Sequence, residues 1–521
     1  MKMKKFLCLA LVTAFTLSIA LTGCGDKSSS STETSTAVES STAAATTSAE
    51  PSSDVPKDTV DLSWYTVGPQ QDPDVDMICQ KANEYLKDKL NVNVKMSVFS
   101  YGDAYNQKVN AMLAAGEAFD IAFTASWAAD FRNSSQAGYL LPLDDYLAKS
   151  PAIYDICTEA FVSASGKVNG KTYGVPTNKE QAHDWGILLK KDLADKYKVD
   201  PAKIKKMEDL EPVFEQVKNG EPGIYPFLSV QMDAPFKFLD WDTFADDDVP
   251  GALYPDNSKT TVVNQFTAPE SVAHYKKMQE YFKKGYLPAD GATLENQVTL
   301  MTSGKYFAVE QSMKPGKALE MKASTGGIDW VQIDLTPVVK SNRETGGSNL
   351  SIPKNSANPE RAFKFIEMLY TDKTLRNMFS YGLEGVHYDK ISDNVIKLKP
   401  DNKGYTSAGC GWRFGDQFKD YLTETEYQNM PDKWDQFKKY NDNATVLNSL
   451  GFVFDRKSVE TEIAACKSVV QNYYRQLFTG SVKDVDAEVA KMDKELKAAG
   501  CEKVIKEMQT QYDAFLAAKS K

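Results

Sequence analysis

Strands and helices alternate between residues 61 and 124, and this order narrows the possible folds more than any other feature. Two segments, Asp61–Val67 and Val92–Val98, have the apolar pattern of β-strands, and amphipathic helices are predicted over 74–90 and 103–115. A short apolar strand at Asp120–Thr124 follows the second helix. Strands separated by helices of this length are typical of βαβ units in a parallel sheet. The sequence therefore predicts an α/β fold.

The later part of the chain resumes this pattern and then departs from it. A strand is predicted at Gly186–Leu189, helices near Leu193 and Leu210, and a further strand at Tyr225–Val230. Aromatic residues and loops follow, and from Val459 to the end the sequence is helical around an apolar stripe. The chain is long enough for two domains of ordinary size.

The N-terminus is predicted to be an export signal. Three lysines in the first five residues precede an apolar run over 6–21, which is shorter than the ~20 residues of a bilayer span. The end of this run, Leu21-Thr-Gly-Cys24, resembles the lipobox of bacterial lipoproteins. The resemblance implies that residues 1–23 are removed and that Cys24 carries a diacylglyceryl group. The alternative is a secretory signal that contains a cysteine by chance. We expect a lipid anchor on the outer face of the cytoplasmic membrane of a bacterium, of the Gram-positive type.

A polar tract separates this signal from the predicted fold. Residues 27–53 contain 16 Ser or Thr and a single large apolar residue, Val38. Such a segment buries too little apolar surface to offset the entropy of ordering, so residues 24–57 are expected to form a disordered linker that begins with the lipidated Cys24. The linker would hold the folded part near the membrane without fixing its orientation.

Charge and cysteine content disfavour several classes of protein. The formal net charge of −10 becomes −13 once the three N-terminal lysines are removed, which argues against a nucleic-acid partner. No second apolar run approaches the length of a membrane span. Five cysteines remain after Cys24, scattered and without a CxxC pair, which is neither a disulfide framework nor a zinc site. Buried thiols, or a single disulfide, are expected among Cys79, Cys157, Cys410, Cys466 and Cys501.

No pattern of catalytic residues stands out in the sequence. Gly166–Thr172 has one residue too few between its glycines for a P-loop, and it predicts an Asn-Gly hairpin turn. Asp72–Asp76 lacks the glycine and the distal glutamate of a calcium loop, and it predicts a helix start whose acidic residues complement the helix dipole. Neither HExxH nor GxSxG occurs. We expect a protein that is not an enzyme and that needs no metal and no cofactor.

Four short motifs follow one another between residues 114 and 370. They are a helix–Gly–Asp–strand step, an Asn-Gly hairpin that leads to Tyr-Gly-Val-Pro, a Gly-Lys strand and an Asn-Pro-Glu helix, at Ala114–Phe123, Val168–Pro176, Leu300–Val309 and Asn358–Tyr370. Each motif alone is weak. In this order and spacing they resemble the carbohydrate-type family 1 of extracellular solute-binding proteins, which serve ABC importers.

The last third of the chain carries a second, narrower similarity. Tyr381–Tyr388, Gly451–Asp455 and the helical tail from Glu462 resemble a lipoprotein branch of that family with an extended C-terminal region. Cys501 departs from the branch, where a hydrophobic or acidic residue is expected after the glycine. This departure bears only on local packing.

The resemblance implies a two-lobed, periplasmic-binding-protein-like fold, also called a Venus flytrap. Each lobe would be a sheet flanked by helices, with the ligand cleft at the hinge. Lobe one is expected at 58–175 plus 330–375. Lobe two is expected at 176–329 plus 376–521, including the helical C-terminal region.

The resemblance also implies a function. A membrane-anchored, monomeric receptor would capture an oligosaccharide between its lobes by hinge closure and deliver it to the permease subunits of an ABC importer. A receptor of the same fold for a peptide or another small solute is an alternative, marked by a charged clamp in the cleft instead of stacked aromatic rings. A surface glycosidase is a third possibility, and it needs two carboxylates about 5 to 9.5 Å apart. No such pair stands out in the sequence.

Aromatic residues at strand ends are the first candidates for ligand contacts, because sugar rings have apolar faces and hydroxyl rims. Trp64 and Tyr65 lie towards the end of the first predicted strand, and one of the two should face the cleft. Trp127 follows the third strand with Asp130 nearby. Packing in the core or at a strand–helix junction is the alternative for these residues.

Further candidates lie near the expected crossovers and in the loop-rich part of the chain. Glu310 and Gln311 belong here because this position faces the cleft in the similar family. For His183 and Trp185 the alternative is a contact between lobes, and for Trp241 it is a place on the outer surface. For Glu384, His387 and Tyr388 the alternative is a structural role at the second crossover. The candidates are His183, Trp185, Trp241, Glu310, Gln311, Glu384, His387, Tyr388, Trp412 and Arg413.

Overall fold

The computed structural model describes residues 55–519, apart from 101–102, 231–234, 296 and 402–403. The predicted signal, Cys24 and nearly all of the predicted linker lie outside the described residues. Their predicted roles therefore stay predictions.

The first sheet contains five strands in the order β2–β1–β3–β14–β6. β1 (Val60–Gly68) pairs in parallel with β2 (Val92–Ser100) and with β3 (Ile121–Thr124), which confirms the βαβ prediction. β14 (Asn349–Ser351) is antiparallel to its neighbours and lies between β3 and β6 (Val175–Pro176). The sheet is thus completed by a strand that comes more than 170 residues after β6.

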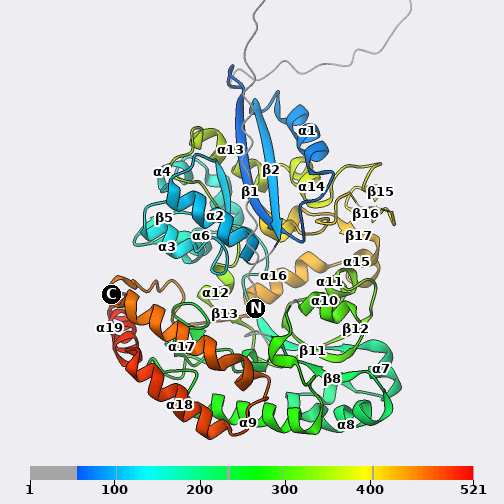
Figure 1. The fold of residues 1–521 in the computed structure, drawn as a ribbon. Helices are drawn as coiled ribbons and strands as arrows, with labels where there is room; N and C mark the ends of the chain where they lie inside the picture. The colour runs from blue at the N-terminus through cyan, green and yellow to red at the C-terminus, as the bar shows by residue number, and fades with distance from the viewer. Residues whose placement is uncertain (1–54, 101–102, 231–234, 296, 402–403, 520–521) are drawn as a thin grey trace, which may run out of the picture. The chain divides into compact units, whose positions relative to one another are not determined.

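Helices cover both faces of this sheet. α1 (Val75–Leu86), α13 (Pro359–Thr371) and α14 (Lys373–Tyr381) share one buried apolar cluster with β1 and β2. α2 (Asp103–Ala115) packs on the other face, where a second apolar cluster lies. Figure 1 shows β1 and β2 side by side, with α1 next to β2. The predicted helices over 74–90 and 103–115 are both present.

The second sheet contains four strands in the order β12–β7–β11–β8. β7 (Asp184–Lys190) is antiparallel to β11 (Tyr306–Met313) and to β12 (Trp330–Asp334), and β11 is parallel to β8 (Tyr225–Leu228). The expectation that this region repeats the parallel pattern therefore holds for β8 and β11 and is wrong for the pairs that β7 makes. β7 enters directly from the first sheet, so no βαβ unit sets its direction.

Sheet membership differs from the expected lobe boundaries at two places. β12 pairs in the second sheet, although lobe one is expected to resume at residue 330. Beyond residue 376, Phe379, Tyr405 and Phe414 belong to the core of the first sheet, although lobe two is expected to begin there. The reason is that the chain returns to the first sheet at β14 and then stays with it through this core.

A short hairpin connects the first sheet to its last strand. β4 (Lys167–Val168) and β5 (Lys171–Thr172) are antiparallel, and the turn residues Asn169 and Gly170 have φ values of 50° and 81°. Positive φ at both central positions is what a two-residue hairpin requires and what Asn-Gly tolerates. The prediction of a hairpin in place of a P-loop is confirmed.

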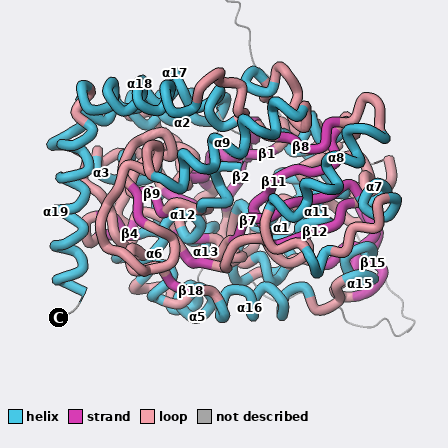
Figure 2. Tube along the Cα trace, turned by 90° about the horizontal axis from the view of Figure 1, so that it is seen from below, coloured by secondary structure: helices cyan, strands magenta, loops and turns pink. Residues whose placement is uncertain are grey.

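Three helices form the C-terminal part of the chain. α17 (Glu460–Phe478), α18 (Val485–Ala498) and α19 (Cys501–Lys519) confirm the predicted helical tail. α17 and α18 lie beside α9 (Pro269–Lys284), as Figures 1 and 2 show. Among the helices in the described part of the chain, none has the length and apolar character of a membrane span.

The chain passes between the two sheets more than once, and the passing segments are bonded to one another. Lys179, which follows β6, donates from Nζ to Glu344 Oε1 at 2.7 Å, and Glu344 lies in α12 (Asn342–Thr345) between β12 and β14. Asn441 at the end of α16 (Lys433–Asn443) accepts from the Gln181 backbone at 2.7 Å and donates to the Lys179 carbonyl oxygen at 3.0 Å. These bonds hold three crossing segments together.

Candidate ligand-binding site

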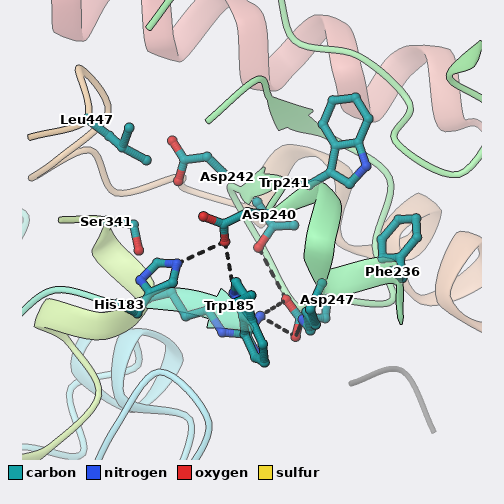
Figure 3. Close-up of a pocket in the computed structure, with 12 residues that line it drawn as sticks. His183, Trp185, Phe236, Asp240, Trp241, Asp242, Asp247, Ser341 and Leu447 are labelled. Atoms are coloured by element: carbon teal, nitrogen blue, oxygen red, sulfur yellow. Dashed lines mark hydrogen bonds and ion pairs between the residues drawn. The ribbon is translucent and has the colours of Figure 1, made fainter. Parts of the chain in front are cut away.

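A pocket lies where β7 begins, at the junction of the crossing segments. Its wall is built by the start of β7, by the segment 236–247, by the start of α12 and by Leu447. Figure 3 shows these side chains around one small space. The pocket holds about 20 Å³ of water-accessible space, room for roughly one water molecule.

Asp240 is the centre of this pocket. Its Oδ1 atom lies 2.9 Å from His183 Nε2 and accepts from Trp185 Nε1 at 3.0 Å (Figure 3). Burial lowers the pKa of His183, but the charge of Asp240 and the bond to it outweigh this effect, and the pKa is raised. Asp240 has a φ of 47°, a conformation that Asp tolerates better than most residues. One carboxylate oxygen thus orients two rings, that of Trp185 in β7 and that of His183 just before this strand.

Three polar atoms at the pocket have no hydrogen-bond partner among the described residues. They are His183 Nδ1, Asp240 Oδ2 and Ser341 Oγ, all buried. Buried polar groups are nearly always satisfied, because leaving one unpaired costs about 1–3 kcal/mol. These atoms offer hydrogen-bonding capacity that a hydroxyl-bearing ligand or a water molecule would satisfy.

The remaining charges of the pocket are already compensated. Asp247 accepts from Lys237 Nζ at 2.7 Å and from Arg343 Nη1 at 2.5 Å (Figure 3). Burial raises the pKa of Asp247, but Arg343 and Lys237 outweigh it and hold the pKa well below its usual range. Lys237 also lies 5.8 Å from the ring centre of Trp185. The positively charged side chains of Lys237 and Arg343 are thus both paired with Asp247.

An exposed aromatic surface lies at the end of β3. Trp127 is 42% exposed, its ring centre lies 6.1 Å from that of the half-buried Trp412, and both rings rest on Phe123. Trp127 Nε1 donates to the Gly347 carbonyl oxygen at 3.0 Å, which fixes the indole ring. A rigid pair of indole rings with one exposed face is suited to stacking against a sugar.

α12 connects this aromatic surface with the pocket. Arg343 lines the pocket, and its carbonyl oxygen accepts from Ser126 Oγ at 3.0 Å. Gly347, which accepts from Trp127, follows this helix directly. Residues from the first sheet and residues from the second sheet therefore meet through a four-residue helix.

Charged residues also face each other next to the pocket. Burial lowers the pKa of the Arg132 guanidinium in α3 (Phe131–Gln136), while the charges of Asp242 and Asp246 oppose that effect. Burial raises the pKa of Asp242 to about 6, and its Oδ2 accepts from Ser449 Oγ. α3 follows β3 of the first sheet, so charges from both halves of the chain influence each other here.

Several predicted site residues lie at this site. The structure brings together His183, Trp185 and Trp241 in the pocket, and it pairs Trp127 with Trp412 on the aromatic surface. Whether they bind ligand stays a prediction.

Other predicted residues lie near these groups without lining the pocket. Tyr65 is half-buried against Phe99 and Phe119. Asp130 is exposed and accepts from Asn133 Nδ2. Glu310 is buried on β11, and the side chain of its neighbour Gln311 bonds to Gln297. Ligand contact by Tyr65, Asp130, Glu310 or Gln311 also stays a prediction.

The structure contradicts a ligand role for Trp64 and Arg413. Trp64 is fully buried, with its ring centre 5.2–5.7 Å from those of Phe365, Phe379 and Phe414. Arg413 is also fully buried and donates from Nη1 to the Val67 carbonyl oxygen at 2.6 Å. α13 and α14 cover the face of β1 that Trp64 occupies, so this tryptophan is core.

The group near residue 384 is also structural. His387 is buried, accepts from the Leu383 backbone at Nδ1 and lies 3.2 Å from Asp74 Oδ2 through Nε2. Tyr388 is buried against Tyr421, and Glu384 is exposed and bridges to Tyr388 through the backbone. His387 thus links the loop before β15 (Tyr388–Ser392) to Asp74 at the start of α1, and none of the three residues lines the pocket. The predicted helix start at Asp72–Asp76 is confirmed.

Sequence reasoning missed the polar residues of the site. Asp240 and Asp242 flank the predicted Trp241, and an alternating carboxylate–aromatic–carboxylate triplet was the available signal. Ser341 and Arg343 lie in a crossing segment without any motif. Within the described part of the chain, no group of three or more His, Cys, Asp or Glu is placed to hold a metal ion.

Asp184→Asn is expected to raise the melting temperature at pH 7. Burial raises the pKa of Asp184 to about 6, against the opposing bond that Tyr440 donates to Oδ1 at 2.5 Å. Because this pKa lies above the unfolded value, the native state binds the proton more tightly. Stability therefore falls as pH rises from about 4 to above 6, and the ionised group costs up to about 3 kcal/mol.

Asparagine keeps an oxygen for Tyr440 and carries no charge. Differential scanning fluorimetry at pH 4 and pH 7 should show the advantage of Asp184→Asn at pH 7 only. A variant that is less stable than the parent at pH 7 would mean that the ionised carboxylate is stabilising.

The sequence matches known families in two regions. The family described as "Bacterial extracellular solute-binding protein" matches residues 80–385, more than half of the chain. A domain of unknown function (DUF3502) matches residues 448–517, which contain α17, α18 and most of α19.

Two characterised relatives cover most of the chain. A carbohydrate ABC transporter substrate-binding protein of Streptococcus pneumoniae is 28% identical over 460 residues, which are 87% of this chain and 91% of that protein. The polygalacturonan/rhamnogalacturonan-binding protein YtcQ of Bacillus subtilis is 23% identical over 379 residues, which are 66% of this chain and 70% of that protein.

Solved structures agree with this assignment. The N-glycan transport solute-binding protein NgtS of Streptococcus pneumoniae has a TM-score of 0.78 at 27% identity, covering 88% of this chain and 99% of that chain. NgtS has also been solved with Man5GlcNAc, and that structure has a TM-score of 0.74. The alginate-binding protein AlgQ2 has a TM-score of 0.59 at 17% identity, covering 88% of this chain and 98% of that chain, which shows a shared fold. The predicted fold class is confirmed, and the chain belongs to the bacterial extracellular solute-binding protein family.

Proposed function

We propose that this protein is the lipid-anchored receptor of a carbohydrate ABC importer and that its ligand is an uncharged oligosaccharide. Membership in a solute-binding family makes it a binding protein and not an enzyme. The observation that carries the proposal is the pair of indole rings at Trp127 and Trp412 joined through α12 to a pocket with three unpartnered polar atoms. The indole rings can stack on the apolar face of a sugar, and the unpartnered polar atoms can form hydrogen bonds with its hydroxyl groups.

The electrostatics of the pocket favour a neutral sugar over a uronic acid. Lys237 and Arg343 both donate to Asp247, so neither cation is held ready for a ligand carboxylate. Asp240 and Asp242 add negative charge to the same wall. A ligand built of neutral hexoses avoids repulsion here, and the similar protein NgtS has been solved in complex with Man5GlcNAc.

The two sheets define the lobes in this proposal. Lobe one contains the five-stranded sheet with α13 and α14, and lobe two contains the four-stranded sheet with the C-terminal helices. The crossing segments at 177–183 and 335–348, together with the segment after α16, act as the hinge, and closure buries the sugar between the lobes. Cys24 and the linker keep a monomeric receptor beside its permease.

A ligand screen tests the proposal directly. Residues 55–521 are mixed with mannose-containing N-glycan fragments, neutral plant oligosaccharides, polygalacturonate oligomers and peptides, and the melting temperature is measured. A ligand at 100 times its Kd stabilises the protein by about 2.7 kcal/mol, which shifts the melting temperature by a few degrees. A shift from neutral sugars, with the sugar recovered intact, supports the proposal. A shift from uronates or peptides alone would overturn the ligand class.

Trp127→Ala locates the site of binding. Loss of an exposed aromatic anchor is expected to weaken binding of the sugar found in the screen by at least ~1 kcal/mol, roughly fivefold. The melting temperature without ligand should stay within a few degrees, because the side chain is 42% exposed. Tyr427→Ala, on α15 (Glu424–Asn429), is the matched control, since Tyr427 is 52% exposed and lies outside the pocket. If Trp127→Ala bound the sugar as tightly as Tyr427→Ala does, Trp127 would not be part of the binding site.

A further inference from the structure

Two cysteine side chains meet where α17 and α19 pack together. Cys466 of α17 and Cys501 at the start of α19 are both buried in one apolar cluster. Cys466 Sγ lies 3.9 Å from the carbonyl oxygen of Ala499, two residues before Cys501. One turn away, Glu462 Oε1 accepts from Lys503 Nζ at 2.6 Å. These contacts bring together the two segments that carry the thiols.

The electrostatics of the two thiols agree with this placement. A hydrogen bond with Cys501 lowers the pKa of Cys466, and the same bond raises the pKa of Cys501. The two thiols therefore interact with each other in the folded protein.

The other buried cysteines of the described chain have different neighbours. Cys79 Sγ accepts from the Met96 backbone at 3.4 Å, and Cys157 Sγ donates to the Pro176 carbonyl oxygen at 3.6 Å. Both belong to the core of the first sheet. They serve as matched controls, because they are equally buried and make no contact with Cys466 or Cys501 that would allow a bond.

We propose that Cys466 and Cys501 form a disulfide bond when the chain folds outside the cell. An extracellular protein meets an oxidising environment in which such bonds persist. While the C-terminal helices are unfolded, the thiolate of one of these two cysteines attacks the disulfide of an oxidant, such as a thiol–disulfide oxidoreductase or oxidised glutathione. The other cysteine then displaces the oxidant's thiol. One S–S bond forms in the protein, and two electrons and two protons pass to the oxidant, whose disulfide is reduced to two thiols.

This bond would tie together the first and third helices of the region that matches the domain of unknown function. It closes a loop that contains all of α18. The same helices support the segment next to the pocket, since Gln509 of α19 accepts from the Val262 backbone at 2.7 Å and Gln471 of α17 donates to Asp248 at 2.9 Å. A cross-link here would stabilise the wall on which Asp240 and Asp242 lie.

Peptide mapping tests the proposal on the full chain. The protein is refolded with oxidised and reduced glutathione, free thiols are alkylated, and a tryptic digest is analysed without reduction. We expect the peptides 458–467 and 498–503 to be joined, and the peptides with Cys79 and Cys157 to be alkylated. Complete alkylation of Cys466 and Cys501, or linkage of either to another cysteine, would overturn the proposal.

Thermal unfolding gives a second, independent readout. Dithiothreitol is expected to lower the melting temperature of the oxidised protein by several degrees, because the cross-link restricts the unfolded chain. Cys466→Ala and Cys501→Ala should remove this dependence on dithiothreitol, whereas Cys79→Ala should retain it. A wild-type protein whose melting temperature does not change with dithiothreitol would contradict the cross-link. Neither readout requires a bound sugar, so failure here would leave the proposed receptor function unaffected.

Discussion

Asp240→Ala is expected to weaken oligosaccharide binding by at least about 2 kcal/mol, roughly thirtyfold. The carboxylate acts at both of its oxygens. Oδ1 holds His183 and Trp185, while the buried Oδ2 has no partner among the described residues and is free for a ligand hydroxyl. Alanine removes the ligand contact and also leaves the two rings without the atom that orients them. A lower melting temperature is expected as well, because burying an unsatisfied donor costs about 1–3 kcal/mol.

Isothermal titration calorimetry with the sugar found in the screen measures this effect. Asp240→Asn keeps an acceptor oxygen and tolerates the positive φ, so its affinity should fall between those of the parent and Asp240→Ala. Asp195→Ala is the control for removal of a carboxylate, since Asp195 is exposed on α7 (Lys191–Lys196) and pairs with Lys191 across one turn. Unchanged affinity in Asp240→Ala would place the ligand elsewhere.

Trp64→Ala is expected to destabilise the fold by about 3–5 kcal/mol. The side chain is fully buried, and three phenylalanine rings from α13, α14 and the loop before residue 415 meet it edge to face. Removal of the indole leaves a cavity at the point where segments 300 residues apart in sequence pack together. Urea denaturation followed by circular dichroism gives the free energy of unfolding.

Trp64→Phe is the matched variant for this site. It keeps a ring in the cluster and removes the indole Nε1, which has no hydrogen-bond partner among the described residues. We expect a loss much smaller than that of Trp64→Ala. If Trp64→Ala folded with nearly the parent's stability and instead lost sugar affinity, the assignment of Trp64 to the core would be wrong.

The fold of the first lobe could be predicted in large part from the sequence. Period-two alternation at Val92–Val98 and the helix that ends before Gly116 are local signals, and local signals fix β1, β2, β3 and the helices between them. Parallel pairing follows from the helices that connect the strands. The second sheet has no such constraint, because β7 enters from a crossing segment. Its antiparallel pairing with β11 and β12 depends on contacts across more than 100 residues.

The candidate site was harder to predict for the same reason. Alternation along β1 indicates that Trp64 and Tyr65 point to opposite faces, but only α13 and α14 decide which face is covered. Arg413 lies between glycines and looks like a mobile loop residue, yet it is buried against the end of β1. Ser341 and Arg343 reach the pocket only because α12 lies between the two sheets. Whether a residue is buried or lines the pocket depends on segments far away in the sequence, so a local sequence pattern does not predict it.

The late arrival of β14 has a consequence for biosynthesis. A chain that emerges outside the cell from its N-terminus presents β1, β2, β3 and β6 long before Asn349–Ser351, the strand that joins β3 to β6. The core of this sheet also requires Phe379, Tyr405 and Phe414. The first lobe therefore cannot complete its folding until about four fifths of the polypeptide has crossed the membrane.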